Sequence, residues 1–337
     1  MVWANLGGSY AAVFNGTVLA VIQDGLMTLF FFTVGMEIKR ELVTGELKTL
    51  GSALLPGIAA LGGMLVPAGI FALLNRGGPG AVGWAIPMAT DIAFCVGCMT
   101  LLGDRVPRGL VVSLTALAIF DDLGGVLVIA LFYGSGLQWP WLLATALVAV
   151  GIVFCGRLGW LVHVLGGVAL WFTVHHSGVH ATIAGVLLGF LVPATPKGID
   201  RFLRVLHPWV SFGVMPLFAL ASSGVVLGGG LPADLSVPLG AGLGLFLGKQ
   251  AGIFVFALVA VKLGVAKLPG TVWQLYGVSV LGGIGFTVAL FIAELAFSQT
   301  PALLAGAKLG ILAGSLLAGV AGLLLLLRGG AGSAEIV

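Results

Sequence analysis

Four charged side chains lie deep inside apolar segments of this 337-residue chain: Asp91, Asp121, Asp122 and Lys249. A charge at the centre of a membrane helix costs about 2.5–3.5 kcal/mol on insertion scales. Lys249 lies about 20 Å from either end of its segment at 1.5 Å per residue, which is too far for its ammonium group to reach water. Charged residues in such positions are candidates for function rather than for packing.

Three carboxylates accompany one ammonium group, so a single ion pair between helices leaves two acids without compensation. These acids must be protonated, bind a cation or contact water. Adjacent helical residues point about 100° apart, so Asp121 and Asp122 face different neighbours. Burial and a nearby acid both favour the protonated form of a carboxyl group. Oxygen ligands suit a hard cation, and we therefore expect these acids to exchange a proton for a metal cation.

The elements that position these residues are long apolar runs. Hydrophobic residues make up 59% of the chain and charged residues 8%, whereas soluble domains have about 25% charged residues. This composition predicts an all-α integral membrane protein, and it excludes a cytosolic enzyme, a nucleic-acid-binding protein and a secreted disulfide module. A spanning helix needs about 20 apolar residues. We expect eleven spans, over 21–38, 53–73, 84–103, 109–133, 139–156, 159–173, 178–193, 208–228, 236–261, 272–297 and 303–327.

The basic residues of the loops predict the orientation. Twelve fall in one set of alternate loops, and two, Arg76 and Lys308, fall in the other set. Because Lys and Arg favour the cytoplasmic side, this division predicts a cytoplasmic C-terminus. An odd number of spans would then leave the N-terminus outside. We therefore expect a largely missing first helix, of which Val2–Asn5 are the tail.

Two of the predicted spans contain helix-breaking residues near their centres. Pro87 removes a backbone donor shortly before Asp91. The tenth segment carries three glycines at mid-span: Gly282, Gly283 and Gly285. A broken helix exposes about half a unit charge at each inner end. Asp91 can offset the positive ends and Lys249 the negative ends.

The positions of the two breaks predict internal symmetry. Interrupted helices in corresponding halves of a transporter mark its binding site, and inverted repeats are common among such proteins. We expect a single transmembrane domain over residues 1–337, with inverted three-helix repeats at about 53–133 and 236–327.

Seven stretches of the chain form a specific combination: 34–42 (VGMEIKREL), 83–87 (GWAIP), 89–94 (ATDIAF), 118–124 (AIFDDLG), 177–182 (SGVHAT), 206–209 (LHPW) and 283–287 (GIGFT). In this order they resemble the NhaA family of sodium–proton antiporters, over nearly the whole chain. The resemblance implies twelve helices, two of them crossed and interrupted at the ion site. It also implies an electrogenic exchanger of the bacterial inner membrane that exports Na+ or Li+, uses no cofactor and serves pH and sodium homeostasis.

The same resemblance implies roles for individual residues. Asp122 would be the principal ion and proton carrier, with Asp121 beside it, so that both carboxylates hold the transported Na+. Lys249 would pair with Asp121. Thr90 and Asp91 would belong to the crossed helices and take part in binding the ion or the proton. Lys249 and Asp91 would compensate charge or carry a proton. The implied partners are the lipid bilayer, small cations and protons, and a homodimer is compatible with the resemblance.

The chain departs from the family pattern at Leu203, in a region predicted to lie at the cytoplasmic side. Some members have an acidic residue linked to pH response four positions before His207, where this chain has Leu203. Glu37 and Glu41, one helical turn apart, remain. Together with His207 they are candidates for a pH response, and the alternative is a solvated helix end in which the two acids pair with neighbouring basic residues.

Three other functions are less consistent with the sequence than ion exchange. An intramembrane aspartyl protease also needs two carboxylates that share a proton, but the chain has neither the tyrosine–aspartate pair nor the Gly-x-Gly-Asp sequence of that family. A cation channel would use rings of carbonyls or acids, and Lys249 in the cation path argues against it. Cys95 and Cys98 have the C-x-x-C spacing, but their apolar helix predicts packing rather than redox chemistry.

Overall fold

The computed structural model describes residues 13–14, 16–45, 48–103, 106–134, 136–155, 159–192, 195–224 and 234–329. Within these ranges the chain forms helices, turns and short connections and contains no strand. The proposed tail of a preceding span, Val2–Asn5, lies outside the described residues, as do Arg105 and Arg157 of the predicted cytoplasmic loops. The prediction of an all-α membrane protein is confirmed.

Seven segments of the described chain are long and apolar enough to cross a membrane: Gly16–Val43, Gly51–Leu74, Pro79–Leu102, Arg108–Phe132, Gly198–Ser222, Ser236–Lys262 and Pro301–Arg328. One further pair of helices, α14 (Val272–Leu281) and α15 (Phe286–Ala296), passes the same test together and is bent by 44° at the break between them. Three shorter helices occupy the remaining predicted segments: α7 (Trp139–Cys155), α8 (Trp160–His176) and α9 (Ile183–Leu191).

Several predicted boundaries differ from the structure: the spans expected at 21–38 and 84–103 both begin five residues earlier, at Gly16 and Pro79. Two further differences have local causes. The segment expected at 178–193 becomes helical only at Ile183, because a turn with Gly178 at φ 83° precedes it. The segment expected at 208–228 belongs to a helix that begins earlier, at Pro196, where the Thr195 hydroxyl caps the first turn by accepting from Gly198 N at 3.2 Å. A glycine turn at the first end and a side-chain cap at the second, rather than hydropathy, set where these helices begin.

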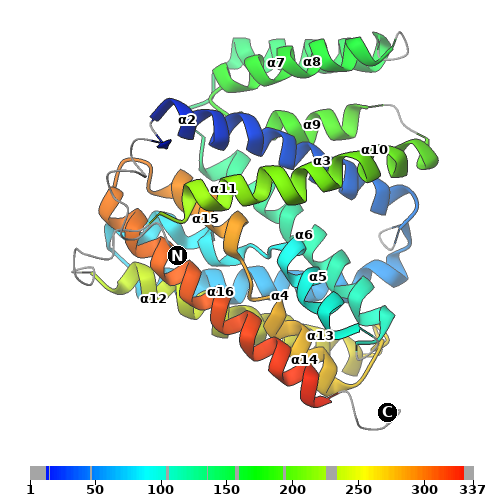
Figure 1. The fold of residues 1–337 in the computed structure, drawn as a ribbon, viewed down its shortest axis with the longest axis vertical. Helices are drawn as coiled ribbons and strands as arrows, with labels where there is room; N and C mark the ends of the chain where they lie inside the picture. The colour runs from blue at the N-terminus through cyan, green and yellow to red at the C-terminus, as the bar shows by residue number, and fades with distance from the viewer. Residues whose placement is uncertain are drawn as a thin grey trace. The chain divides into compact units, whose positions relative to one another are not determined.

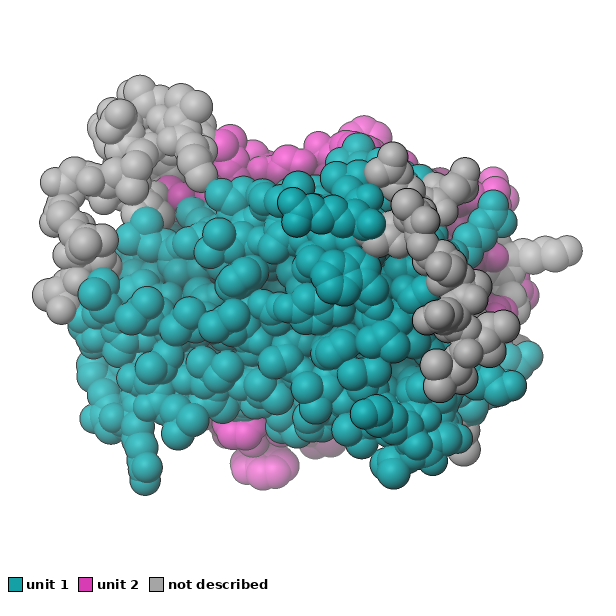
Figure 2. Space-filling view, turned by 90° about the horizontal axis from the view of Figure 1, so that it is seen from below, with its two compact units in different colours: residues 1–5, 46–125, 225–337 teal, residues 6–45, 126–224 magenta. Residues whose placement is uncertain are grey.

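The chain divides into two compact units, which Figure 2 colours separately. Unit 1 comprises residues 1–5, 46–125 and 225–337, and unit 2 comprises residues 6–45 and 126–224. The two predicted repeats fall within unit 1 apart from residues 126–133.

Unit 1 contains the interrupted helices (Figure 1). In chain order its elements are α4 (Leu50–Leu74), the 3-10 helix η4 (Pro79–Met88), α5 (Ile92–Leu102), α6 (Arg108–Phe132) as far as Gly125, α12 (Ser236–Leu243), the π-helix η9 (Gly244–Gly248), α13 (Lys249–Lys262), α14, α15 and α16 (Pro301–Gly329). Helices α4 and α13 pack with their backbones close together, because a side chain at Gly252 would collide with the Gly62 carbonyl. Small residues permit such contacts between membrane helices.

Unit 2 is built from α2 (Gly16–Ala20), the π-helix η2 (Val21–Leu26), α3 (Met27–Val43), α7, α8, α9, α10 (Pro196–Trp209), the π-helix η7 (Val210–Val214) and α11 (Met215–Ser222), with the last residues of α6. Gly35 and Gly189 let α3 and α9 approach closely, since a Cβ at Gly35 would lie 2.7 Å from the Val186 carbonyl. Leu203, the position at which the chain departs from the family pattern, is 2% exposed and packs in a small core with Met36.

Candidate functional site

The first interruption separates η4 from α5. Residues 89–91 are not helical, and Ala89 has an extended backbone with φ −75° and ψ 147°. Asp91 begins α5 as its N-cap, and its Oδ1 accepts a hydrogen bond from Phe94 N at 3.2 Å. Pro87 lies within the preceding 3-10 helix. The break predicted from Pro87 and Asp91 is therefore present.

The second interruption separates α14 from α15 and consists of residues 282–285. A Cβ at Gly285 would lie 2.9 Å from the Ala89 carbonyl oxygen and 2.6 Å from a Leu245 methyl carbon. A Cβ at Gly283 would lie 3.0 Å from that of Ala318. The neighbouring segments of the same chain thus leave no space for a side chain at these positions, which explains why they are glycines.

The two interruptions contact each other through Asp91. Its backbone N donates to the Ile284 carbonyl at 2.7 Å. Its Oδ2 accepts from Thr287 N at 3.2 Å and from the Thr287 hydroxyl at 2.5 Å. Together with the bond from Phe94 N, one carboxylate therefore serves the N-termini of both α5 and α15. A negative charge in this place offsets the positive ends of both helices, as the sequence predicted.

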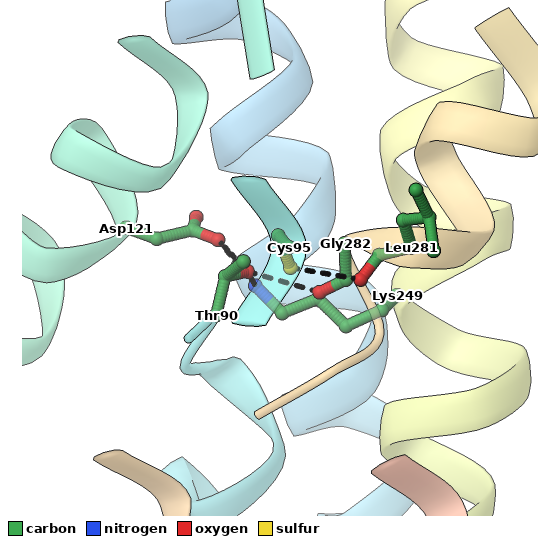
Figure 3. Close-up of polar contacts among 6 residues, drawn as sticks. All are labelled: Thr90, Cys95, Asp121, Lys249, Leu281 and Gly282. Carbon is green, nitrogen blue, oxygen red and sulfur yellow. Dashed lines mark hydrogen bonds and ion pairs between the residues drawn. The ribbon is translucent and has the colours of Figure 1, made fainter. Parts of the chain in front are cut away.

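A buried charged cluster lies next to this crossing (Figure 3). Lys249 Nζ forms an ion pair with Asp121 Oδ2, and both side chains are fully buried. Lys249 Nζ also donates to Thr90 Oγ1 at 2.8 Å. The Thr90 hydroxyl lies 2.6 Å from Asp121 Oδ2 and 3.0 Å from the Gly282 carbonyl oxygen. The structure thus brings Thr90, Asp121, Lys249 and the second break together.

One oxygen of the cluster takes part in none of these hydrogen bonds. Asp121 Oδ1 is buried and has no hydrogen-bond partner among the described residues, which is uncommon for a buried polar atom. Asp122, the next residue of α6, is 5% exposed. Because neighbours on a helix point about 100° apart, the Asp122 carboxyl group projects to a different part of the surroundings than Asp121.

The polar groups of the cluster are a carboxylate, a hydroxyl and the ammonium group of Lys249. In the part of the chain that the structure describes, no group of three or more His, Cys, Asp or Glu residues is arranged to hold a metal ion. The carboxylate and hydroxyl oxygens of Asp121 and Thr90 suit a hard cation, which does not need soft ligands.

The three candidates for a pH response lie in unit 2. His207 Nε2 of α10 is 3.0 Å from Glu37 Oε1 of α3, and Arg40 pairs with Glu41 at 3.0 Å. Glu41 is only 9% exposed, so the helix end around it is not fully solvated. Lys39 donates to the Phe190 and Val192 carbonyls at the end of α9. A role of these residues in pH response stays a prediction.

Three residues at the crossing have contacts that the sequence did not predict. The Cys95 thiol donates to the Leu281 carbonyl at 3.0 Å, so this residue does more than pack. The Ser315 hydroxyl accepts from Gly285 N at 3.3 Å and from Phe286 N at 3.2 Å. Thr287 bonds to Asp91, as described above. In the sequence, these residues differ from their surroundings only in being single polar side chains within apolar segments, which does not indicate what they contact.

These features define a polytopic all-α membrane protein in which two interrupted helices meet at buried acids. The family described as Na+/H+ antiporter 1 matches residues 2–326, and the chain belongs to this family. It is 49% identical to "Na(+)/H(+) antiporter NhaA 1" of Myxococcus xanthus (strain DK1622), over 97% of this chain and 87% of that protein. It is 51% identical to "Na(+)/H(+) antiporter NhaA 2" of Klebsiella pneumoniae, over 90% of this chain and 84% of the relative.

A third relative, "Na(+)/H(+) antiporter NhaA" of Anaeromyxobacter sp. (strain Fw109-5), is 49% identical over 95% of this chain and 80% of its own length. The resemblance seen in the sequence motifs is confirmed. Because the family consists of transporters rather than enzymes, the protease alternative is wrong.

Proposed function

We propose that this protein exchanges cytoplasmic Na+ or Li+ for external H+ by alternating access and thereby serves pH and sodium homeostasis. Membership of the Na+/H+ antiporter 1 family supports the exchange of Na+ for H+. The bacterial relatives named NhaA and the alternation of basic loops support a place in the inner membrane with a cytoplasmic C-terminus.

One observation carries the proposal: buried acids lie at the meeting point of two interrupted helices. Asp121 Oδ2 is held by Lys249 and Thr90, while its Oδ1 has no hydrogen-bond partner within the described part of the chain. Asp122 is buried beside it on α6. In this assignment Asp122 is the principal carrier of the cation or the protons, and Asp121 supplies a second carboxylate.

Because the metal cation and the protons compete for the same carboxylates, the transport of one is coupled to that of the other, and no additional coupling site is needed. A cation at Asp121 and Asp122 needs both groups ionised, and protonation removes the charge that binds it. When the cation leaves, burial favours the protonated form of these carboxyl groups over the ionised form. Two acids that take up more than one proton for each cation would move net charge, which supports electrogenic exchange.

Alternating access requires the site to open to one side at a time. Among the described residues, the hydrogen bonds that join the two interruptions run through Asp91, through the Thr90 hydroxyl and through the Cys95 thiol. Few bonds must therefore rearrange for the half-helices to shift. Interrupted helices at a binding site are typical of transporters that operate in this way.

The test is exchange by the Asp122→Asn variant in sealed vesicles. Asparagine keeps the shape of the side chain but cannot carry a proton or a full negative charge. We expect exchange driven by a pH gradient to be lost, with normal folding judged by gel filtration. The matched control is Asp200→Asn, which alters an exposed acid of α10 and should leave exchange unchanged.

Sodium uptake that persists in Asp122→Asn when a pH gradient drives it would contradict the assignment of Asp122. A cation current independent of protons in the unaltered protein would instead favour the channel alternative and contradict antiport itself.

A further inference from the structure

The C-terminal end of α14 is held by side chains of the other interrupted helix. The last carbonyls of a helix have no partner inside it. Here the Leu281 carbonyl accepts from Ile284 N at 3.0 Å, which closes the turn, and also from the Cys95 thiol at 3.0 Å. The next carbonyl, that of Gly282, lies 3.0 Å from the Thr90 hydroxyl. Figure 3 shows both contacts beside Asp121 and Lys249.

The Thr90 hydroxyl has more partners than its single proton can serve. Lys249 donates to its oxygen, while Asp121 Oδ2 and the Gly282 carbonyl both lie within hydrogen-bond distance as acceptors. An ionised carboxylate is the stronger acceptor, so the proton points to Asp121 when Asp121 is charged. When a proton or a cation neutralises Asp121, the Gly282 carbonyl becomes the better acceptor. No covalent bond changes, because only the O–H bond rotates.

This exchange of partners is possible only while the Gly282 carbonyl stays near Thr90. The thiol bond from Cys95 ties the preceding residue, Leu281, to the first turn of α5. Cys95 is 0% exposed, so no water can replace the thiol without a rearrangement. Asp121 Oδ1 is buried and has no hydrogen-bond partner among the described residues, which independently supports ligand binding at this cluster.

We propose that Cys95 is a positioning residue of the transport site. Its thiol holds the end of α14 so that the Thr90 proton can pass from Asp121 to the Gly282 carbonyl when Asp121 is neutralised. The charge state of Asp121 is thereby communicated to the second interrupted helix. This inference rests on the function proposed above and adds a residue that touches neither the cation nor the carboxylates.

The first test compares sodium dependence in three variants. Cys95→Ala removes the donor, Cys95→Ser keeps one, and Cys98→Ala removes the thiol one turn further along α5. The loss of one hydrogen bond predicts a rise of about threefold to tenfold in the sodium concentration for half-maximal exchange in Cys95→Ala. The pH at half-maximal exchange should shift as well. Cys95→Ser should stay within about twofold of the unaltered protein and Cys98→Ala should match it.

A purely structural role predicts a different pattern. Cys95→Ala would then lower thermal stability or yield but keep the sodium and pH dependence of the unaltered protein, and that result would overturn the inference. If the unaltered protein shows no exchange at all, the proposed function fails instead. The two failures are therefore distinguishable.

A second measurement does not depend on activity. In a variant with Cys98 and Cys155 replaced by alanine, the S–H stretching band in the infrared spectrum reports on Cys95 alone. We expect added Na+ to shift this band, because the Gly282 carbonyl gains a hydrogen bond from Thr90, and this bond polarises the adjoining peptide group whose Leu281 carbonyl accepts from Cys95. We also expect Thr90→Val to abolish the shift. A band that does not respond to Na+ in the folded protein would contradict the inference.

Discussion

The two interruptions differ in what they offer to the site. The first, at residues 89–91, provides side chains: Thr90 bonds to Asp121, and Asp91 serves two helix ends. The second, at residues 282–285, provides backbone: the Gly282 carbonyl oxygen lies 3.0 Å from the Thr90 hydroxyl, and the Ile284 carbonyl accepts from Asp91 N at 2.7 Å. The first break therefore supplies a carboxylate and a hydroxyl group. The second supplies backbone carbonyl groups, and its glycines leave space for the first break to approach. Neither break could perform the function of the other.

This difference explains why the acids of the site can be buried. The carboxylate of Asp91 is compensated by the N-termini of α5 and α15, and that of Asp121 by the ammonium group of Lys249. A buried charge without such partners would be strongly destabilising. The glycines of the second break let these partners approach.

Removal of the shared side chain at the first break should have the largest effect. Asp91→Ala deprives the N–H groups of Phe94 and Thr287 of a charged acceptor. Hydrogen bonds to charged groups contribute about 1.5–3 kcal/mol each, so the free energy of unfolding should fall by about 3 kcal/mol or more. Thermal unfolding in detergent measures this change, and the exposed Asp200→Ala serves as the control. Equal stability of both variants would show that Asp91 does not hold the crossing.

Addition of a side chain at the second break should have the next largest effect. Gly285→Ala places a methyl group 2.9 Å from the Ala89 carbonyl oxygen, and overpacking of this kind costs about 1–3 kcal/mol. The control is Gly125→Ala on α6, where a Cβ would meet no atom within 4 Å. Exchange and thermal stability should fall in the first variant only. If Gly285→Ala is tolerated as well as the control, the second break is not restricted to backbone.

The smallest effect should come from Ser315→Ala, which removes an acceptor outside both breaks. Its hydroxyl accepts from Gly285 and Phe286 N–H groups, so its loss should lower stability by about 1 kcal/mol. The control is Ser279→Ala, because the Ser279 hydroxyl donates to the Leu275 carbonyl of its own helix at 2.8 Å. Larger destabilisation in Ser279→Ala would show that Ser315 does not support the start of α15.

Much of this arrangement could be predicted from single residues. Buried charges in apolar runs indicated the site, Pro87 and three glycines indicated the breaks, and helix dipoles indicated the place of Asp91. The contacts of Thr90, Cys95 and Ser315 could not be predicted, because they depend on how distant segments cross. Hydropathy also could not predict the start of α10, which a polar cap determines.

The most direct test of the account is proton release when salt is added to the purified protein. If a cation and protons compete for the same carboxylates, Na+ or Li+ should release protons from the unaltered protein, and the apparent affinity for Na+ should rise as fewer protons compete at higher pH. Asp122→Asn should release few or none. Proton binding that Na+ and Li+ leave unchanged at every pH would contradict the central claim.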